Sequence, residues 1–117
     1  MLKVYSYAKC STCQKALKFL EKKHVKFTAI SIIDTPPSKN ELKQMLNHLE
    51  GNIRKLFNTS GELYREMGLS QKIMTLTENE CLKLLSEHGK LIKRPFILGP
   101  SIGLVGFNEE AYTKHFS

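Results

Sequence analysis

The spacing of hydrophobic positions predicts a strand, a helix and a second strand over the first third of the chain. Residues 2–7 alternate in type, as a half-buried strand does. From Ser11 onward, apolar side chains recur every three or four residues between Cys13 and Leu20, which is the stripe of an amphipathic helix. Residues 26–33 are rich in β-branched and aromatic side chains, so they predict a second strand, parallel to the first across that helix.

The middle of the chain, residues 38–88, carries helical signals. Two capping boxes, each a hydroxyl residue followed three positions later by a glutamate, predict helices that begin after Ser38 and Thr77. Gly51 and Gly89 follow the two apolar stripes and are predicted to close these helices. Shorter apolar clusters between them predict two further helical stretches. The sequence therefore predicts a helical insertion at about residues 38–88.

The end of the chain returns to strands. Residues 96–98 and 102–106 predict two antiparallel strands around a Gly-Pro-Ser turn. Asn108 precedes two glutamates and is predicted to cap a final helix. The order β-α-β, helical insertion, β-β-α predicts an α/β fold with a thioredoxin-like (glutaredoxin-type) mixed sheet, folded as a single domain over residues 1–117.

Composition excludes several classes of protein. Hydrophobic residues make up 41% of the 117 positions and charged residues 25%, which excludes a disordered, collagenous or coiled-coil chain. No apolar run reaches the roughly 20 residues that span a bilayer. The first residues lack the long apolar stretch of a signal peptide, so we expect a cytoplasmic protein whose thiols are kept reduced. We also expect a monomer.

Positive charge is concentrated in the first half of the chain. The formal net charge is +7, and residues 1–60 hold 11 Lys and Arg against 4 Asp and Glu. Six lysines lie between Lys9 and Lys26, with Glu21 as the single acid among them. These lysines form either a solvated helix face or a field that attracts an oxyanion, glutathione or an acidic protein surface. No aromatic residues interleave with them and no DNA-binding motif is present, so we expect no direct contact with nucleic acid.

A C-x-x-C motif, Cys10-Ser11-Thr12-Cys13, lies where the first strand turns into the first helix. A thiolate at Cys10 would lie near the free N–H groups of the first helical turn, and Lys9 adds positive charge. We therefore predict that Cys10 has a lowered pKa and is the nucleophile, with Cys13 as the resolving thiol.

Two other interpretations of the cysteines stay open at this point. A structural zinc site needs two more ligands, but Cys81 and the four histidines are scattered, so we predict no metal site. Two inert buried thiols are the other alternative. Cys81 shares a helical face with Leu84 and Leu85 and is expected to be a packed core thiol.

Five segments of the chain carry a resemblance to a known family: residues 5–16, 58–61, 64–69, 91–95 and 105–109. In these segments, and over essentially its whole length, the chain resembles the glutaredoxin-coupled arsenate reductases (ArsC type) and the related Spx and MgsR proteins. The Lys-Arg-Pro of residues 93–95, followed by Gly-Phe-Asn at residues 106–108, is characteristic of this group.

The resemblance implies roles for particular residues. Cys10 matches the family's nucleophile, and Arg94 matches the arginine before its cis-proline, here Pro95. That arginine faces the cysteine, where a guanidinium fork can stabilise a thiolate or bind arsenate or a glutathione carboxylate. Lys9, Ser11, Thr12, Asn58 and Pro95 are then expected to bind the anion or support the site. No cofactor is implied, and glutathione or thioredoxin is the implied reductant.

Two departures from the family pattern bear on the substrate. The arsenate reductases use two more arginines around the oxyanion, and Asn58 and Gly106 occupy those positions here. A charge-assisted hydrogen bond contributes about 1.5–3 kcal/mol, so we do not expect arsenate to be the substrate.

The second cysteine, Cys13, matches the Spx branch instead. The resemblance to Spx implies an oxidation switch and binding to the RNA polymerase α subunit, with Gly51 near the contact. The sequence thus supports a small thiol oxidoreductase, and alternatively an Spx-like redox-sensing regulator.

Overall fold

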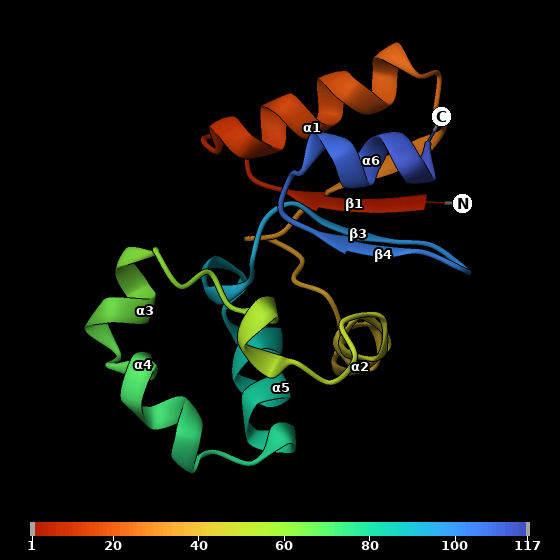
Figure 1. Cartoon of the computed structure of the whole chain (residues 1–117). Helices are drawn as coiled ribbons and strands as arrows, with labels where there is room; N and C mark the ends of the chain where they lie inside the picture. The colour runs from red at the N-terminus through yellow and green to blue at the C-terminus, as the bar shows by residue number, and fades with distance from the viewer. Residues whose placement is uncertain (1, 117) are drawn as a thin grey trace.

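A four-stranded mixed sheet forms the centre of the computed structural model, which describes residues 2–116. The strands lie in the order β2-β1-β3-β4, as Figure 1 shows. Their bounds are β1 Leu2–Ser6, β2 Phe27–Ser31, β3 Phe96–Leu98 and β4 Gly103–Val105. Strands β1 and β2 are parallel, and β3 is antiparallel to both β1 and β4. The predicted β-α-β and β-β-α ends are confirmed: β3 has the predicted bounds, and the other three strands are slightly shorter than expected.

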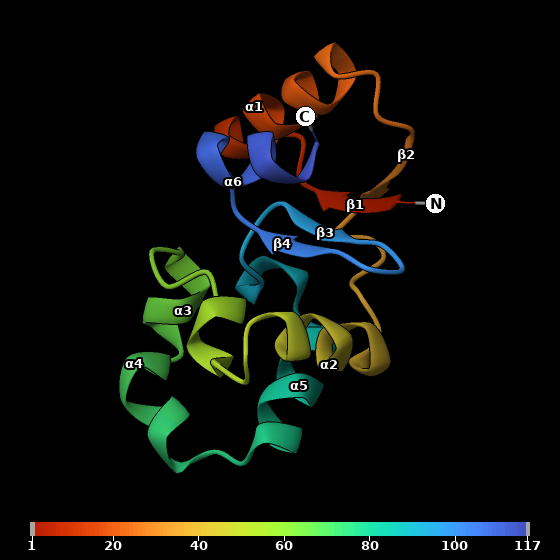
Figure 2. The same cartoon turned by 45° about the vertical axis from the view of Figure 1, so that its right-hand side comes forward.

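Helices α1 (Ser11–Lys22) and α6 (Glu109–His115) cover one face of this sheet (Figures 1 and 2). The predicted apolar stripe of α1 is confirmed, because Cys13, Ala16 and Leu20 are fully buried. Asn108 caps α6 as predicted, since its Oδ1 accepts a hydrogen bond from Ala111 N at 2.9 Å.

The helical insertion covers the other face. Its helices are α2 Lys39–His48, α3 Glu62–Glu66, α4 Leu69–Lys72 and α5 Glu78–Glu87, with 3₁₀ helices η1 Ile53–Leu56, η2 Ile73–Thr75 and η3 Gly89–Leu91. Both predicted capping boxes are present, at Ser38 and Thr77. No helix within residues 2–116 has the length and apolar character needed to cross a membrane.

The two glycines predicted to close helices behave differently. Gly51 has φ +80°, and its N–H donates to Leu46 O at 2.9 Å, so it closes α2 as predicted. The prediction for Gly89 was wrong: α5 ends at Glu87, and Gly89 begins η3. A Cβ at Gly89 would overlap the carbonyl oxygen of Ile32. This glycine is therefore required for close packing of two backbone segments rather than for a left-handed turn.

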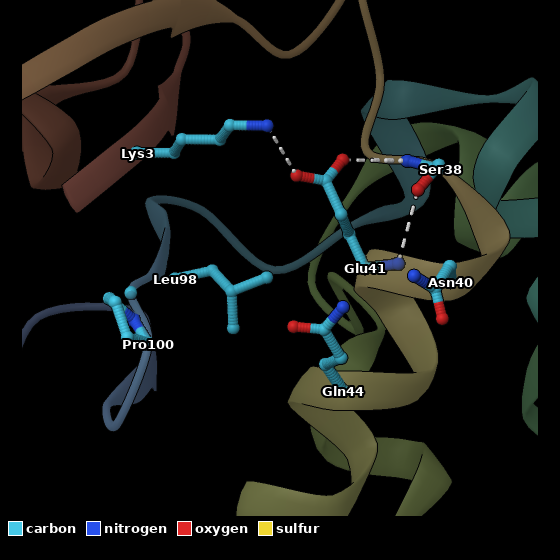
Figure 3. Close-up of a pocket in the computed structure, with 8 residues that line it drawn as sticks. Lys3, Ser38, Asn40, Glu41, Gln44, Leu98 and Pro100 are labelled. Atoms are coloured by element: carbon cyan, nitrogen blue, oxygen red, sulfur yellow. Dashed lines mark hydrogen bonds and ion pairs between the residues drawn. The ribbon is translucent and has the colours of Figure 1, made fainter. Parts of the chain in front are cut away.

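Glu41 links the insertion to the sheet (Figure 3). It accepts hydrogen bonds from Lys3 Nζ at 3.0 Å, Tyr5 Oη at 2.8 Å and Ser38 N at 3.1 Å. Partial burial opposes the carboxylate charge, but the bonds from Ser38, Tyr5 and Lys3 outweigh it and lower the pKa of Glu41. The N-terminus of α2 is thereby fixed against β1.

Candidate functional site

Cys10 is the N-cap residue of α1. Its backbone is extended, with φ −101° and ψ 111°, and its Sγ accepts a hydrogen bond from Cys13 N at 3.2 Å. The sulfur thus occupies the place that a serine or aspartate oxygen usually takes at a helix N-terminus. On the other side, Cys10 N donates to Tyr7 O at 3.0 Å, which fixes the turn after β1. The predicted position of the motif, at the start of the helix, is confirmed.

The two thiols of the motif differ in acidity. Partial burial raises the pKa of Cys10, but hydrogen bonds from the thiol and the backbone N–H of Cys13, together with the Arg94 guanidinium, outweigh it and lower that pKa. Cys13 has none of its surface exposed, and burial and its hydrogen bond to Cys10 raise its pKa to about 12. Cys10 is therefore the thiol that ionises first, and Cys13 retains its proton.

Arg94 reaches this site from the opposite end of the sequence. The Arg94–Pro95 peptide bond is cis, as the family resemblance implied. The Arg94 Cζ lies 5.1 Å from the centre of the Tyr7 ring, a cation–π contact that holds the guanidinium beside the turn leading to Cys10. Pro95 is buried, and its carbonyl oxygen accepts a hydrogen bond from Gly106 N at 2.9 Å. The junction between the insertion and β3 thereby presents a cation to the Cys10 sulfur.

Asn58 is brought to the same place by a short antiparallel bridge. Asn58 N donates to Leu91 O at 2.7 Å, and Lys93 N donates to Leu56 O at 2.8 Å. This pairing places Asn58 and Arg94 on the wall of one cavity of about 180 Å³. The cavity is lined by Tyr7, Asn58, Gly61, Glu62, Leu63, Lys90 and Arg94.

The other predicted site residues lie outside this cavity. Lys9, Ser11 and Thr12 are exposed in the turn and the first turn of α1. Gly106 has φ +73°, and a Cβ there would lie 3.0 Å from Lys93 Cε, so a larger residue would be strained. At the two positions where the resemblance implies further arginines, this chain has Asn58, which lines the cavity, and Gly106, which does not.

Sequence reasoning missed five lining residues of the cavity: Tyr7, Gly61, Glu62, Leu63 and Lys90. Tyr7 was placed in a strand and in the family resemblance of residues 5–16 without a role at the site, and the other four residues were given no role at the site. The segments that hold these residues meet at the cavity through pairing between parts of the chain that are far apart in the sequence. No local pattern in the sequence carried that information.

Cys81 lies in the core, away from this site. Cys81 is 1% exposed and packs in the core cluster on the insertion side of the sheet, as expected. Burial, with Glu80 and Glu78 nearby, raises its pKa. Among residues 2–116, no group of three or more His, Cys, Asp or Glu side chains is placed to hold a metal ion.

A C-x-x-C motif at the N-terminus of the first helix, next to a cis-proline and on a mixed sheet of this order, defines a thioredoxin-like protein with a thiol site. Residues 5–115 match the ArsC family, and the chain belongs to that family.

Individual relatives agree with this assignment. The protein YusI of Bacillus subtilis (strain 168) is 40% identical over 116 residues, covering 99% of this chain and 98% of that protein. The global transcriptional regulator Spx 2 of Bacillus anthracis is 29% identical over 114 residues, covering 97% of this chain and 86% of the regulator.

Solved structures show the same similarity. A protein from Bacteroides fragilis, described as related to the ArsC family, superposes with a TM-score of 0.91 at 41% identity, covering 97% of this chain and 95% of that one. A possible arsenate reductase from Streptococcus mutans superposes with a TM-score of 0.88 at 34% identity, covering 97% of this chain and 98% of that one.

Proposed function

We propose that this ArsC-family protein is a small cytoplasmic thiol–disulfide oxidoreductase, in which Cys10 attacks and Cys13 resolves. The observation that carries the proposal is the asymmetry of the pair. Cys13 N donates to Cys10 Sγ at 3.2 Å and the Cys10 pKa is lowered, whereas the buried Cys13 thiol is held protonated. An attacking thiol must ionise first, and a resolving thiol must stay close and protected until a mixed disulfide forms.

The reaction is a two-step exchange. The Cys10 thiolate attacks one sulfur of a substrate disulfide, forming a mixed disulfide and releasing the other sulfur as a thiolate that takes a proton from water. Cys13 then loses its proton and attacks Cys10 Sγ. This step releases the second substrate thiolate and leaves a Cys10–Cys13 disulfide. The substrate disulfide gains two electrons, which the cysteine pair loses.

The cavity beside Arg94 supports glutathione as reductant rather than arsenate as substrate, and thioredoxin stays an alternative reductant that the cavity does not bear on. Arg94 and Lys90 supply two cations, Asn58 supplies an amide and Glu62 supplies one carboxylate around about 180 Å³, so the lining has a formal charge of only +1. A guanidinium fork with a neighbouring amide suits a carboxylate, which has one negative charge. Arsenate carries more negative charge, and Asn58 and Gly106 supply no cation for it.

A turnover assay tests the proposal. The protein is supplied with a peptide disulfide and with either glutathione or thioredoxin plus their reductases, and peptide reduction is followed. We expect turnover for the wild type and for Cys81→Ser, the matched thiol control, and none for Cys10→Ser. Turnover that survives in Cys10→Ser would overturn the proposal.

A second candidate function is that of a redox-sensing regulator that binds the RNA polymerase α subunit. It is favoured by the similarity to Spx 2 over 97% of the chain. Gly51 is exposed at the end of α2, where a partner can reach it. The test measures how the C-terminal domain of polymerase α binds to the reduced and to the oxidised protein, with Gly51→Arg as the interface variant. Absence of binding in both redox states would reject this function.

A further inference from the structure

Helix α1 carries a stripe of lysines that starts next to the reactive thiol. At about 100° per residue, Lys15, Lys18 and Lys22 fall within an arc of roughly 60°, on the side opposite the buried face of the helix. All three side chains are exposed, and Ser11, directly after Cys10, lies on the same side. These three lysines are called the lysine stripe below.

The charge of the lysine stripe is not neutralised within the described part of the chain. The ion pairs found among residues 2–116 join Lys3 to Glu41 and Lys43 to Glu78, and neither involves α1. No acidic residue lies in the first turn of α1. A purely solvated face usually mixes both signs of charge, whereas the arc that holds the lysine stripe has one sign. Glu21, the acidic residue of α1, lies roughly 60° beyond the edge of that arc and has no ion pair with the stripe among the described residues.

The stripe gives the helix itself little net stability. Lys22 lies in the last turn of α1, where a cation interacts favourably with the helix dipole by about 0.3–1 kcal/mol, but repulsion between the lysines opposes this gain. Lysines spaced three and four residues apart repel each other, and such a pair costs about 0.2–0.5 kcal/mol. The apolar face of α1 already stabilises the helix against the sheet, because Cys13, Ala16 and Leu20 are fully buried. The lysine stripe is therefore better explained by an interaction with something outside the chain.

Resting on the proposed function, we propose that the lysine stripe docks an acidic protein segment whose cysteine, present as a disulfide, is attacked by Cys10. The stripe runs for about 10 Å along the helix axis, and its far end lies about 18 Å from Cys10. An extended segment advances about 3.3–3.6 Å per residue, so about five residues cover that distance. The partner is a segment with several Asp or Glu within about six positions of the reacting cysteine.

The lysine stripe acts on association and leaves the exchange chemistry unchanged. The bonds that form and break are those of the two-step exchange above, and the partner's own disulfide is the oxidant. A one-signed field near a reactive group raises the association rate of an oppositely charged partner by roughly 10- to 1,000-fold, and salt removes the effect. A small neutral disulfide gains nothing from it.

The test uses two peptides of equal length, each with one cysteine as a mixed disulfide with 2-thiopyridine. One carries four glutamates beyond the cysteine and the other four serines. Release of thiopyridone gives the rate for the wild type and for Lys15→Glu/Lys18→Glu/Lys22→Glu. A control with the same change in net charge, Lys39→Glu/Lys72→Glu/Lys83→Glu, alters exposed lysines outside α1. A glutamine version of the stripe variant serves if the glutamate version does not fold.

We expect the wild type and the control to prefer the acidic peptide by at least about tenfold at low salt. We expect the stripe variant to lose that preference while its rate with the serine peptide is unchanged. The proposal is overturned if the stripe variant keeps the preference or if the control loses it equally. Reaction of both peptides at Cys10 at equal rates overturns the docking proposal alone. Failure of both peptides to react at Cys10 overturns the proposed function, and the docking proposal with it.

Discussion

Replacing Arg94 with alanine separates a role in the thiol site from a structural role. The guanidinium is a hydrogen-bond donor and a nearby charge for the Cys10 sulfur, and it also lies over the Tyr7 ring. In Arg94→Ala the sulfur stays partly buried but loses this stabilisation of its negative charge, so the pKa of Cys10 rises. Arg94→Lys keeps the charge without the planar fork, so its Cys10 pKa is expected to lie between those of the wild type and Arg94→Ala.

The size of the effect follows from the exposure of the two groups. A hydrogen bond to a charged group contributes about 1.5–3 kcal/mol. Both side chains are only partly buried, so solvent screening reduces this to about 1 kcal/mol. At pH values below the Cys10 pKa, that loss lowers the fraction of thiolate about fivefold. A more basic thiolate is intrinsically about twice as nucleophilic, so the net loss of rate is about two- to threefold.

The assay is the rate of reaction with the neutral disulfide bis(2-hydroxyethyl) disulfide, followed from about pH 6 to about pH 10 to bracket an ordinary thiol pKa. The curve for Arg94→Ala should lie below the wild type at low pH, cross it, and reach a plateau about twofold higher. Arg65→Ala, which removes an exposed arginine from α3, should follow the wild type. Unchanged rates in Arg94→Ala at every pH, with a lower melting temperature, would refute the reasoning and leave Arg94 a structural role.

Three further changes test other parts of the structure. Tyr7→Leu removes the ring beneath Arg94 and should shift the rate-versus-pH curve partway toward that of Arg94→Ala; an unshifted curve would deny Tyr7 a positioning role. The pKa of Glu41 is lowered by folding, so its stabilisation is present above the unfolded pKa of about 4.3 and is lost as the pH falls through the folded value. In Glu41→Gln, the free energy of unfolding, measured by urea denaturation, should therefore fall less steeply on acidification than in the wild type. An equally steep fall would show that Glu41 is not the source of this pH dependence. Gly89→Ala should lower the free energy of unfolding by about 3 kcal/mol, because its Cβ overlaps the Ile32 carbonyl oxygen. Gly51→Ala, with open space around the Cβ, should cost only about 1 kcal/mol, and equal costs would contradict the packing explanation.

The features that could be predicted from the sequence are those that depend on neighbours within about four residues. The capping boxes at Ser38 and Thr77 join side chains to backbone groups one helical turn away, so their residue types alone indicate them. The position of Cys10 at the start of α1 could be predicted for the same reason. Its sulfur bonds to Cys13 N, and both residues belong to one motif.

The features that could not be predicted depend on pairing between distant segments. Tyr7 meets Arg94 across most of the length of the chain, and Asn58 reaches the cavity through its bond to Leu91. Gly89 was mistaken for a helix-closing residue, because a glycine after an apolar stripe has the same local pattern whether it turns the chain or lets two backbones pack. The Arg94 and Asn58 positions came from family resemblance and not from the local sequence pattern.

The most direct test of the central claim is a peptide map of the protein after reaction with glutathione disulfide under anaerobic conditions. We predict that Cys13→Ser accumulates glutathione on Cys10, whereas the wild type passes through that adduct to a Cys10–Cys13 disulfide with Cys81 still free. Cys10→Ser should react slowly, because the remaining two thiols are buried and their pKa values are raised. Glutathione found first on Cys13 or Cys81, or a disulfide that includes Cys81, would contradict the assignment of Cys10 as the attacking thiol.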